Sequence, residues 1–285
     1  MKAQFECGTL MNPDDYENII EPVNVNNQSY TFLIQIHVIN NSDGTGGATL
    51  AEVQGIRDRL TECYSPSLIN FVEICEPDVI NSDIFANTDK TWIRNSIFNV
   101  NRLPNVINIY LFPLNPAILG GTLDGGEGGT ATLPDDDRFP ALWIGDDDEF
   151  NIGSYFVNSN IICHEMGHIF NLLHTHAEFD VLPPGVPAPL ISAKLNVTTL
   201  CARGDKVCDT APSFNIGAFG ILNNDCDLVG YRTGPGQTGA IPNDPDGFLY
   251  TPDPRNYMSN SDADCIYILQ IQQGDDLQIF KFVKQ

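Results

Sequence analysis

The sequence predicts an α/β fold up to about His176 and irregular structure beyond it. Two observations support this prediction. Up to His176, apolar segments rich in β-branched residues alternate with segments whose apolar residues recur every three or four positions. Beyond His176 this patterning fades into Pro/Gly-rich stretches. Because alternating strands and helices favour strands that run in one direction, the sheet should be largely parallel.

The first predicted strand spans Tyr30–Ile39, because this segment is dense in β-branched and aromatic residues. An amphipathic helix follows, with Thr49 as a candidate N-cap and apolar residues at positions 50, 53, 56, 60 and 63. Further strands are predicted in SLINFVEIC, NVINIYLFPL and ALWIG, and a shorter helix in KTWIRNSIFNVN. After a glycine-rich stretch, Thr130–Leu133 predict a short edge strand.

Two more helices are predicted towards the end of the chain. From about Ser159 to Leu173 the apolar residues return to helical spacing, and the last segment, YILQIQQGDDLQIFKFV, also has the pattern of a helix. Residues 1–28 are polar and lack a clear period, so they predict an N-terminal arm. Residues 29–285 contain no internal repeat and no strong linker, and are expected to form one domain.

The charge of the chain excludes several classes of partner. The chain has 285 residues, with 37 Asp and Glu against 14 Lys and Arg, and a net charge of −23. Because a chain this acidic is repelled by polyanions, nucleic acid and anionic membrane surfaces are not expected partners. No run of about 18 apolar residues occurs, so no membrane span is predicted. With 42% apolar residues, the chain can bury a substantial core.

The eight cysteines favour an oxidising compartment. Four of them cluster in the loop-rich last third, and Cys63 and Cys75 flank a short segment, a distribution that suits disulfides. Asn27, Asn40 and Asn196 begin N-x-S/T sequons, which are compatible with secretion. The chain is therefore expected to be secreted. Since MKAQFECGTL lacks the apolar core of a signal peptide, a processed N-terminus is expected.

The chemistry is concentrated in the segment HEMGHIFNLLH of the second long helix. His164 and His168 are four residues apart, hence on one helical face, and two imidazoles so placed can bind one Zn²⁺. Glu165 can take a proton from a zinc-bound water and pass it to a leaving amine. His174 supplies a third ligand if the helix ends before it. Asn171 is the expected turn residue, because Asn tolerates the left-handed conformation at a helix end.

Simpler interpretations of these residues stay open. A bare HExxH pattern occurs by accident in many proteins, and His174 and His176 could be ordinary surface histidines. The zinc hypothesis is favoured because three of the five histidines lie in one eleven-residue segment, with a turn residue between them. His37 is expected to be a satisfied histidine of the core or the sheet edge, and is assigned no role.

These residues resemble the metzincin metallopeptidases, whose signature is HExxHxxGxxH followed at a distance by a methionine-bearing turn. The second element is similar to NYMSNSDADC, in which Met258 lies 84 residues beyond His174. Within the metzincins, the chain looks most like the pappalysin and cytophagalysin group. The likeness rests on GGTATLP, on GDKVCDTAP and on a cysteine seven residues beyond Met258, and it covers about residues 28–265.

The resemblance implies a metzincin-type catalytic domain. Its upper subdomain, about residues 29–173, would hold a twisted, mostly parallel sheet and two long helices, including the zinc helix. Its lower subdomain, about residues 174–285, would be irregular, with the Met-turn and a C-terminal helix. Met258 would pack beneath the zinc site in a structural role. The GGTATLP strand would bind an extended peptide along its open edge.

Further roles follow from the same resemblance. Asp205, Asp209 and Thr210 match a segment that could hold a structural Ca²⁺, although a solvated acidic loop explains them equally well. Asp264 would lie near the pocket beyond the scissile bond and would favour Arg or Lys there. Asn260 stands where the family has the Tyr thought to stabilise the oxyanion, and is a shorter candidate donor.

Cys7, in the sequence CGT, resembles a pro-segment cysteine that occupies the open zinc position, which would make residues 1–28 a pro-segment. Cys163 would then stay unpaired and buried beside the zinc helix, and six cysteines would form three disulfides. The alternative is that Cys7 is itself a disulfide cysteine.

The function implied is that of a secreted zinc endopeptidase, expected to be a monomer, that acts on proteins or peptides. Asn171 replaces the family's Gly without harm to the turn, but Asn260 in place of Tyr and the loose match of the C-terminal segment IYILQ leave a catalytically inactive metzincin-like binding protein as one alternative. The acidic composition leaves a calcium-dependent extracellular binding protein as another.

Overall fold

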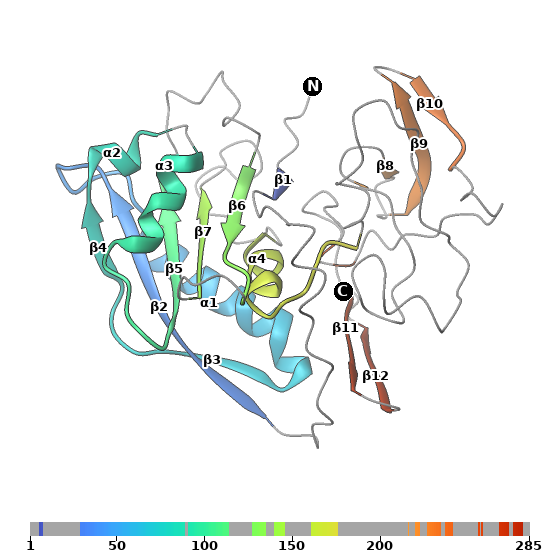
Figure 1. The fold of residues 1–285 in the computed structure, drawn as a ribbon, viewed down its shortest axis with the longest axis horizontal. Helices are drawn as coiled ribbons and strands as arrows, with labels where there is room; N and C mark the ends of the chain where they lie inside the picture. Colours follow the sequence, from blue (N-terminus) through green and yellow to red (C-terminus); the bar gives the residue numbers. More distant parts are fainter. Residues whose placement is uncertain are drawn as a thin grey trace. The chain divides into compact units, whose positions relative to one another are not determined.

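The computed structural model describes residues 6–7, 29–88, 91–113, 127–134, 140–145, 161–175, 216, 220–222, 227–234, 237–241, 256, 258, 268–273 and 276–281. The chain divides into two compact units, which are described one by one (Figure 1). The first unit comprises Met1–Leu10 and Asn27–Asn171. The second comprises Met11–Asn26 and Leu172–Gln285.

The first unit contains a seven-stranded sheet with the order β1-β6-β7-β5-β2-β3, in which β4 also pairs with β2. All of these pairings are parallel except that of β6 with β7, so the predicted, mostly parallel sheet is confirmed. The strands are β1 Glu6–Cys7, β2 Tyr30–Asn40, β3 Ile69–Glu73, β4 Asp78–Asn81, β5 Ile107–Phe112, β6 Glu127–Ala131 and β7 Ala141–Gly145.

Helices cover both faces of this sheet (Figure 1). The face that carries Ile39, Tyr110 and Trp143 packs against α2, Asp83–Ala86, and against the 3₁₀ turn Ile97–Asn99 that follows α3, Thr91–Ser96. The opposite face is covered by two helices that contact each other, α1 and α4. α1 spans Leu50–Tyr64 and continues into a 3₁₀ turn at Ser65–Ser67, and α4 spans Ile161–Ile169. Because side chains alternate along a strand, each central strand contributes to two apolar layers.

The start of α1 confirms the predicted cap. The Thr49 hydroxyl accepts a hydrogen bond from the Glu52 amide at 3.3 Å, and the Thr49 amide donates to the Glu52 carboxylate at 2.6 Å. This reciprocal capping box satisfies two amides that the helix itself leaves without partners. The buried face of α1 carries Val53, Ile56 and Leu60, at the predicted helical spacing.

His37 is a satisfied core histidine, as expected. Its Nδ1 lies 3.0 Å from a carboxylate oxygen of Asp78, and its Nε2 lies 3.1 Å from the side-chain oxygen of Asn108. The ring stacks on Tyr110, with 4.5 Å between the centroids. Burial raises the pKa of the Tyr110 hydroxyl. His37 therefore links β2 to two of its three partner strands, β4 and β5, in the interior.

Three expectations for the first unit need correction. β4 and α2 were not predicted, because both are only four residues long and such a segment carries too little periodicity. β6 is not the edge of the sheet, since β1 pairs with its other side. α4 ends at Ile169 rather than near Leu173, because the chain turns at Asn171.

The second unit holds more strand than the sequence predicted. β8, Gly220–Leu222, and β10, Gln237–Gly239, flank β9, Leu228–Gly234, in an antiparallel sheet. The prediction of a C-terminal helix is wrong, because β11, Ile268–Gln273, and β12, Asp276–Lys281, form an antiparallel hairpin. The two residues between these strands are Gly-Asp, a pair typical of tight hairpin connections, and this signal outweighs the apparent helical spacing.

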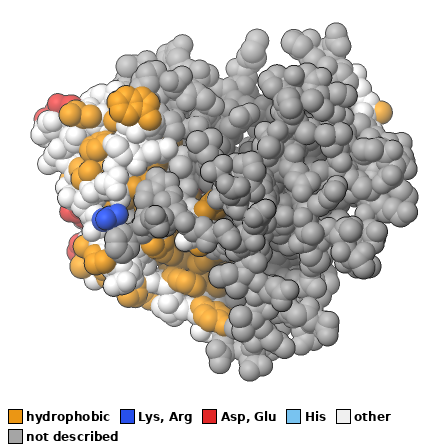
Figure 2. All heavy atoms as spheres, viewed as in Figure 1, with side chains coloured by type: hydrophobic (Ala, Val, Ile, Leu, Met, Phe, Trp, Pro, Cys, Tyr) orange, Lys and Arg blue, Asp and Glu red, His pale blue; other side chains and the backbone are white. Residues whose placement is uncertain are grey.

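Part of the surface of the first unit is apolar. Leu33 in β2 and Val72 in β3 are paired across the two strands and are 45% and 48% exposed. Figure 2 shows further apolar side chains exposed among the described residues on the side of the molecule that it views. Within the described ranges no helix has the length and apolarity needed to cross a membrane.

Candidate metal centre

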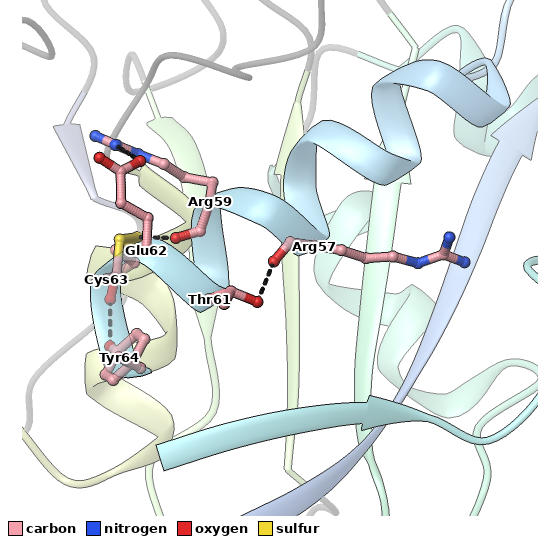
Figure 3. Close-up of a disulfide and its surroundings, with 7 residues drawn as sticks. Arg57, Arg59, Thr61, Glu62, Cys63 and Tyr64 are labelled. Atoms are coloured by element: carbon pink, nitrogen blue, oxygen red, sulfur yellow. Dashed lines mark hydrogen bonds and ion pairs between the residues drawn. A yellow bond between two sulfur atoms is a disulfide. The ribbon is translucent and has the colours of Figure 1, made fainter. Parts of the chain in front are cut away.

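The helix α4 is attached to α1 by a disulfide between Cys63 and Cys163, which are 100 residues apart in sequence. Figure 3 shows the α1 side of this link, where the Tyr64 hydroxyl also donates a 2.6 Å hydrogen bond to the Cys163 carbonyl. The expectation that Cys163 stays unpaired is therefore wrong. Cys75 was expected to be one of six cysteines that form three disulfides. It is an exposed free thiol, so this expectation is wrong as well. Sequence spacing could not reveal this pairing, because it depends on how two helices pack.

An aromatic cluster fixes the C-terminal end of α4. The ring of Phe170 lies 4.8 Å from Phe32, 5.6 Å from Tyr64 and 6.3 Å from Phe71, measured between centroids. These partners come from β2, α1 and β3, so the end of α4 is held by three separate elements. The residues that follow the helix therefore leave it from a defined position.

The helix ends at Ile169, earlier than predicted, but the chain turns at the predicted residue, Asn171. The Phe170 amide still donates to the carbonyls of Met166 and Gly167, and the Asn171 amide donates to the His168 carbonyl at 2.9 Å. Asn171 then has a φ of 64°, in the left-handed region that usually requires glycine and that Asn tolerates best among other residues. The predicted reversal of the chain before His174 is confirmed.

This reversal brings three histidines together. The Nε2 atoms of His164 and His168 are 3.2 Å apart, and their rings are nearly perpendicular. His174 joins them, with one donor atom from each of the three residues within 4.8 Å of the others. All three side chains are buried, so His174 is not the ordinary surface histidine of the simpler interpretation, while His176 lies outside the described residues.

The three donors fit a zinc ion. Two nitrogens bound at about 2.0–2.1 Å to a tetrahedral zinc ion lie about 3.3 Å apart. The separation of 3.2 Å between His164 and His168 is close to that value. Imidazole nitrogens suit zinc, and three protein ligands leave one coordination position for a water or a substrate. The donor set therefore supports a metal site, with zinc as the best-matching ion.

Glu165 follows the first of these histidines and is completely buried. α4 contacts β6 and β7 of the sheet, and the side chain of Glu165 lies against Gly129 of β6. The Glu165 carboxyl group is therefore held out of bulk water, on the residue that directly follows His164.

Within the second unit, the residue after His174 is bonded to Met258. The Thr175 amide donates to the Met258 carbonyl at 2.9 Å, and the Thr175 hydroxyl donates to the same oxygen at 3.4 Å. The Met258 amide in turn donates to the side-chain oxygen of Asn256 at 3.0 Å. Met258 is buried, and its backbone fixes the segment that carries His174.

The remaining predicted residues divide into two groups. Cys7 lies in β1, where its backbone is in register with Gly129 of β6. The others, Asp205, Asp209, Thr210, Asn260 and Asp264, lie outside the described residues.

Sequence reasoning missed two contributors to this site, Gly129 and Thr175. Gly129 belongs to a glycine-rich stretch that was interpreted as a loop running into an edge strand. Glycine inside a strand often marks a close approach of another group, which is the signal that could have identified it. Thr175 carried no signal, because its partner Met258 is 83 residues away.

Comparison with protein-family models and with curated protein sequences yields no match. Among solved structures, the chain is similar to metalloproteinase-II from Bacteroides fragilis, with 14% sequence identity and a TM-score of 0.31. The similarity covers 60% of this chain and 53% of that chain, so the match spans about half the length of the bacterial protein.

Proposed function

We propose that this chain is a zinc-dependent endopeptidase. The observation that carries the proposal is the convergence of His164, His168 and His174 on one buried point, with Glu165, the residue after His164, also fully buried. Three imidazoles with one open position are typical of catalytic rather than structural zinc sites. The pattern HExxH on a helix, with a third histidine after a turn, assigns peptide hydrolysis as the reaction.

Each residue has a distinct role in this proposal. The three histidines hold the metal, which when bound supplies a Lewis acid for a water and for the scissile carbonyl. Glu165 accepts the proton that the attacking water loses and delivers it to the nitrogen of the leaving amine. Thr175 and Met258 hold the segment of His174 through their backbone hydrogen bond.

The N-terminal arm, residues 1–28, acts in this proposal as a pro-segment. Support comes from β1, which lies along β6, the strand on which an extended peptide substrate would add. Cys7 is the candidate latency residue because its backbone is in register with Gly129, which lies against Glu165.

Secretion is part of the same proposal. The disulfide Cys63–Cys163 supports it, because such bonds persist mainly in oxidising compartments. Substrates would be proteins or peptides, and the enzyme would be a monomer.

The finer assignments rest on the sequence resemblance to the pappalysin group. They are a basic preference after the cut through Asp264, an oxyanion donor at Asn260, and a structural Ca²⁺ at Asp205, Asp209 and Thr210.

The test is hydrolysis of casein or gelatin by the full chain, loaded with one equivalent of zinc. Wild type should cleave these substrates, a zinc chelator should abolish cleavage, and peptide mapping should show the preferred residue after the cut. Glu165→Ala should keep the zinc and lose nearly all turnover. Asp58→Ala, which removes an exposed carboxylate of α1, is the matched control and should keep full activity.

Three outcomes would contradict the proposal. Full turnover by Glu165→Ala would exclude this residue as the general base. Zinc binding without hydrolysis by any preparation, including one truncated before residue 29, would instead favour the inactive metzincin-like protein. Calcium binding without zinc binding would favour the calcium-dependent binding protein.

A further inference from the structure

The strand β6 approaches Glu165 more closely at Gly129 than a side chain would allow. A Cβ atom added to Gly129 would lie 2.9 Å from Cγ of Glu165, 2.9 Å from its Oε1 and 3.1 Å from the carbonyl oxygen of Trp143. Contacts under 3.0 Å are essentially never seen for a real Cβ, so one of these groups would have to move. Gly129 itself is buried.

Backbone conformation does not explain the glycine. Among the described glycines, positive φ values occur at Gly44 and Gly46, and Gly129 is not one of them. An L-residue could therefore adopt the backbone of Gly129, and what excludes a side chain there is the space that Glu165 occupies.

The group that would move is the Glu165 side chain. The carbonyl of Trp143 belongs to β7, which is paired on both sides, with β5 and with β6. The Trp143 ring is buried and its Nε1 donates to Asn95 at 2.7 Å, which further fixes this strand. Glu165 reaches Gly129 through a side chain with three rotatable bonds, and a rotamer change disturbs no strand pairing.

We propose that Gly129 is a positioning residue that gives the Glu165 carboxylate its place beside the metal position. The inference rests on the proposed peptidase function, since it assigns Gly129 to the same general base. A general base acts only within hydrogen-bond reach of the proton it takes, and a displacement of about 1 Å can reduce turnover about 10²-fold. The atoms nearest to a methyl group at position 129 belong to Glu165 and Trp143, so the carboxylate is the metal-site group that it would displace first.

The test is a double-mutant cycle of wild type, Gly129→Ala, Glu165→Ala and the double variant, with thermal unfolding measured without metal and with zinc. Gly129→Ala should lower the Tm by about 2–4 °C when Glu165 is present. In the Glu165→Ala background the drop in Tm should be smaller or absent, because both contacts under 3.0 Å are removed and only the 3.1 Å contact with the Trp143 carbonyl remains, while alanine suits a strand better than glycine. This readout does not depend on activity.

Kinetics supply the second readout. Gly129→Ala should lower kcat about 10²-fold, with KM and zinc stoichiometry nearly unchanged. Gly44→Ala is the control, because Gly44 is exposed, has a φ of 84° and has nothing within 4 Å of its Cβ position. It should destabilise the fold through backbone strain and keep wild-type kcat. A kcat loss in both variants would attribute the effect to destabilisation and overturn the inference.

The other possible outcomes of these experiments also support or contradict the role of Gly129. An equal drop in Tm in both backgrounds would place the clash on β7 rather than on Glu165 and would overturn the inference. If Gly129→Ala does not fold, folding of the double variant supports the inference and its failure to fold contradicts it. If wild type hydrolyses nothing, the proposed function fails, while the thermal cycle still reports whether Gly129 sets the place of Glu165.

Discussion

The Nε2 atoms of His164 and His168 lie 3.2 Å apart in the buried face of α4. Without a metal, one of these ring nitrogens can donate a hydrogen bond to the other, and a zinc ion bound to both would replace that single hydrogen bond with two coordination bonds. The folded protein should therefore gain stability from zinc. At a free zinc concentration of about 100 times Kd, the expected gain in the free energy of unfolding is about 2.7 kcal/mol. Thermal unfolding with zinc, and again after chelation, measures this gain, and an unchanged Tm would contradict a preformed metal site.

Removal of the third donor tests the composition of the site. His174→Ala should lower zinc affinity by at least about 10–100-fold, because one of three direct donors is lost. His176→Ala is the matched control, since it removes a histidine two residues further along and should keep wild-type affinity. Isothermal titration with zinc compares the two variants. The opposite result would mean that the third ligand is His176.

The turn at Asn171 should control whether His174 reaches the other two histidines. Asn171→Gly should keep stability and zinc affinity, because glycine adopts a φ of 64° without strain. Asn171→Val should cost about 1–2 kcal/mol of stability, since a β-branched residue is disfavoured in the left-handed region. Its zinc affinity should fall along with stability. Equal affinities in the glycine and valine variants would show that His174 does not depend on this conformation.

The disulfide Cys63–Cys163 should contribute much of the stability of the first unit. Removal of both cysteines by Cys63→Ala and Cys163→Ala should cost about 2–5 kcal/mol, because a cross-link across a loop of 100 residues restricts the unfolded chain strongly. Cys75→Ala changes an exposed free thiol and should have no effect. Urea unfolding of the two variants measures the difference. A thiol reagent should label Cys75 and leave Cys63 and Cys163 unlabelled in the native protein.

The first unit was largely predictable because its signals are local. The strand at Tyr30–Asn40 and the helix at Leu50–Tyr64 both carry periodicity over many residues, and Thr49 with Glu52 forms a complete capping signal. The C-terminal hairpin was misjudged because ILQIQQ and DLQIFK are short and contain apolar residues that suit either period. Only the Gly-Asp pair between them separates the two interpretations.

The metal centre was predictable only in its ligands. His164, His168 and His174 lie within one segment, and a conformational preference of Asn171 is enough to connect them. The groups that support them come from distant parts of the chain, such as Cys63 for α4 and Met258 for Thr175. No local pattern encodes such contacts, since they form only when the sheet and helices pack. The same reason explains why Cys163 was wrongly expected to be unpaired.

The ion pair between Arg57 of α1 and Glu73 of β3 should give the protein an unusual dependence of stability on pH. Burial raises the pKa of Glu73 above its usual value of 4.5, and the attraction of Arg57 only partly offsets this effect. The folded protein then binds a proton at Glu73 more tightly than the unfolded chain does. The contribution of Glu73 to stability is therefore fully present below about pH 4.5 and is lost as the pH rises through the pKa that Glu73 has in the folded protein. Glu73→Gln should remove this loss.

Asp43 provides the matched control with the opposite sign. The hydroxyl and the amide of Thr45 donate to its carboxylate at 2.6 and 3.0 Å, and these hydrogen bonds lower the pKa of Asp43 below its usual value of 3.8. Its contribution is therefore present above about pH 3.8 and is lost as the pH falls through the folded pKa. Urea unfolding between pH 3 and pH 7 should show wild type losing stability relative to Glu73→Gln with rising pH, and gaining stability relative to Asp43→Asn. If both differences had the same sign, Arg57 rather than burial would dominate at Glu73.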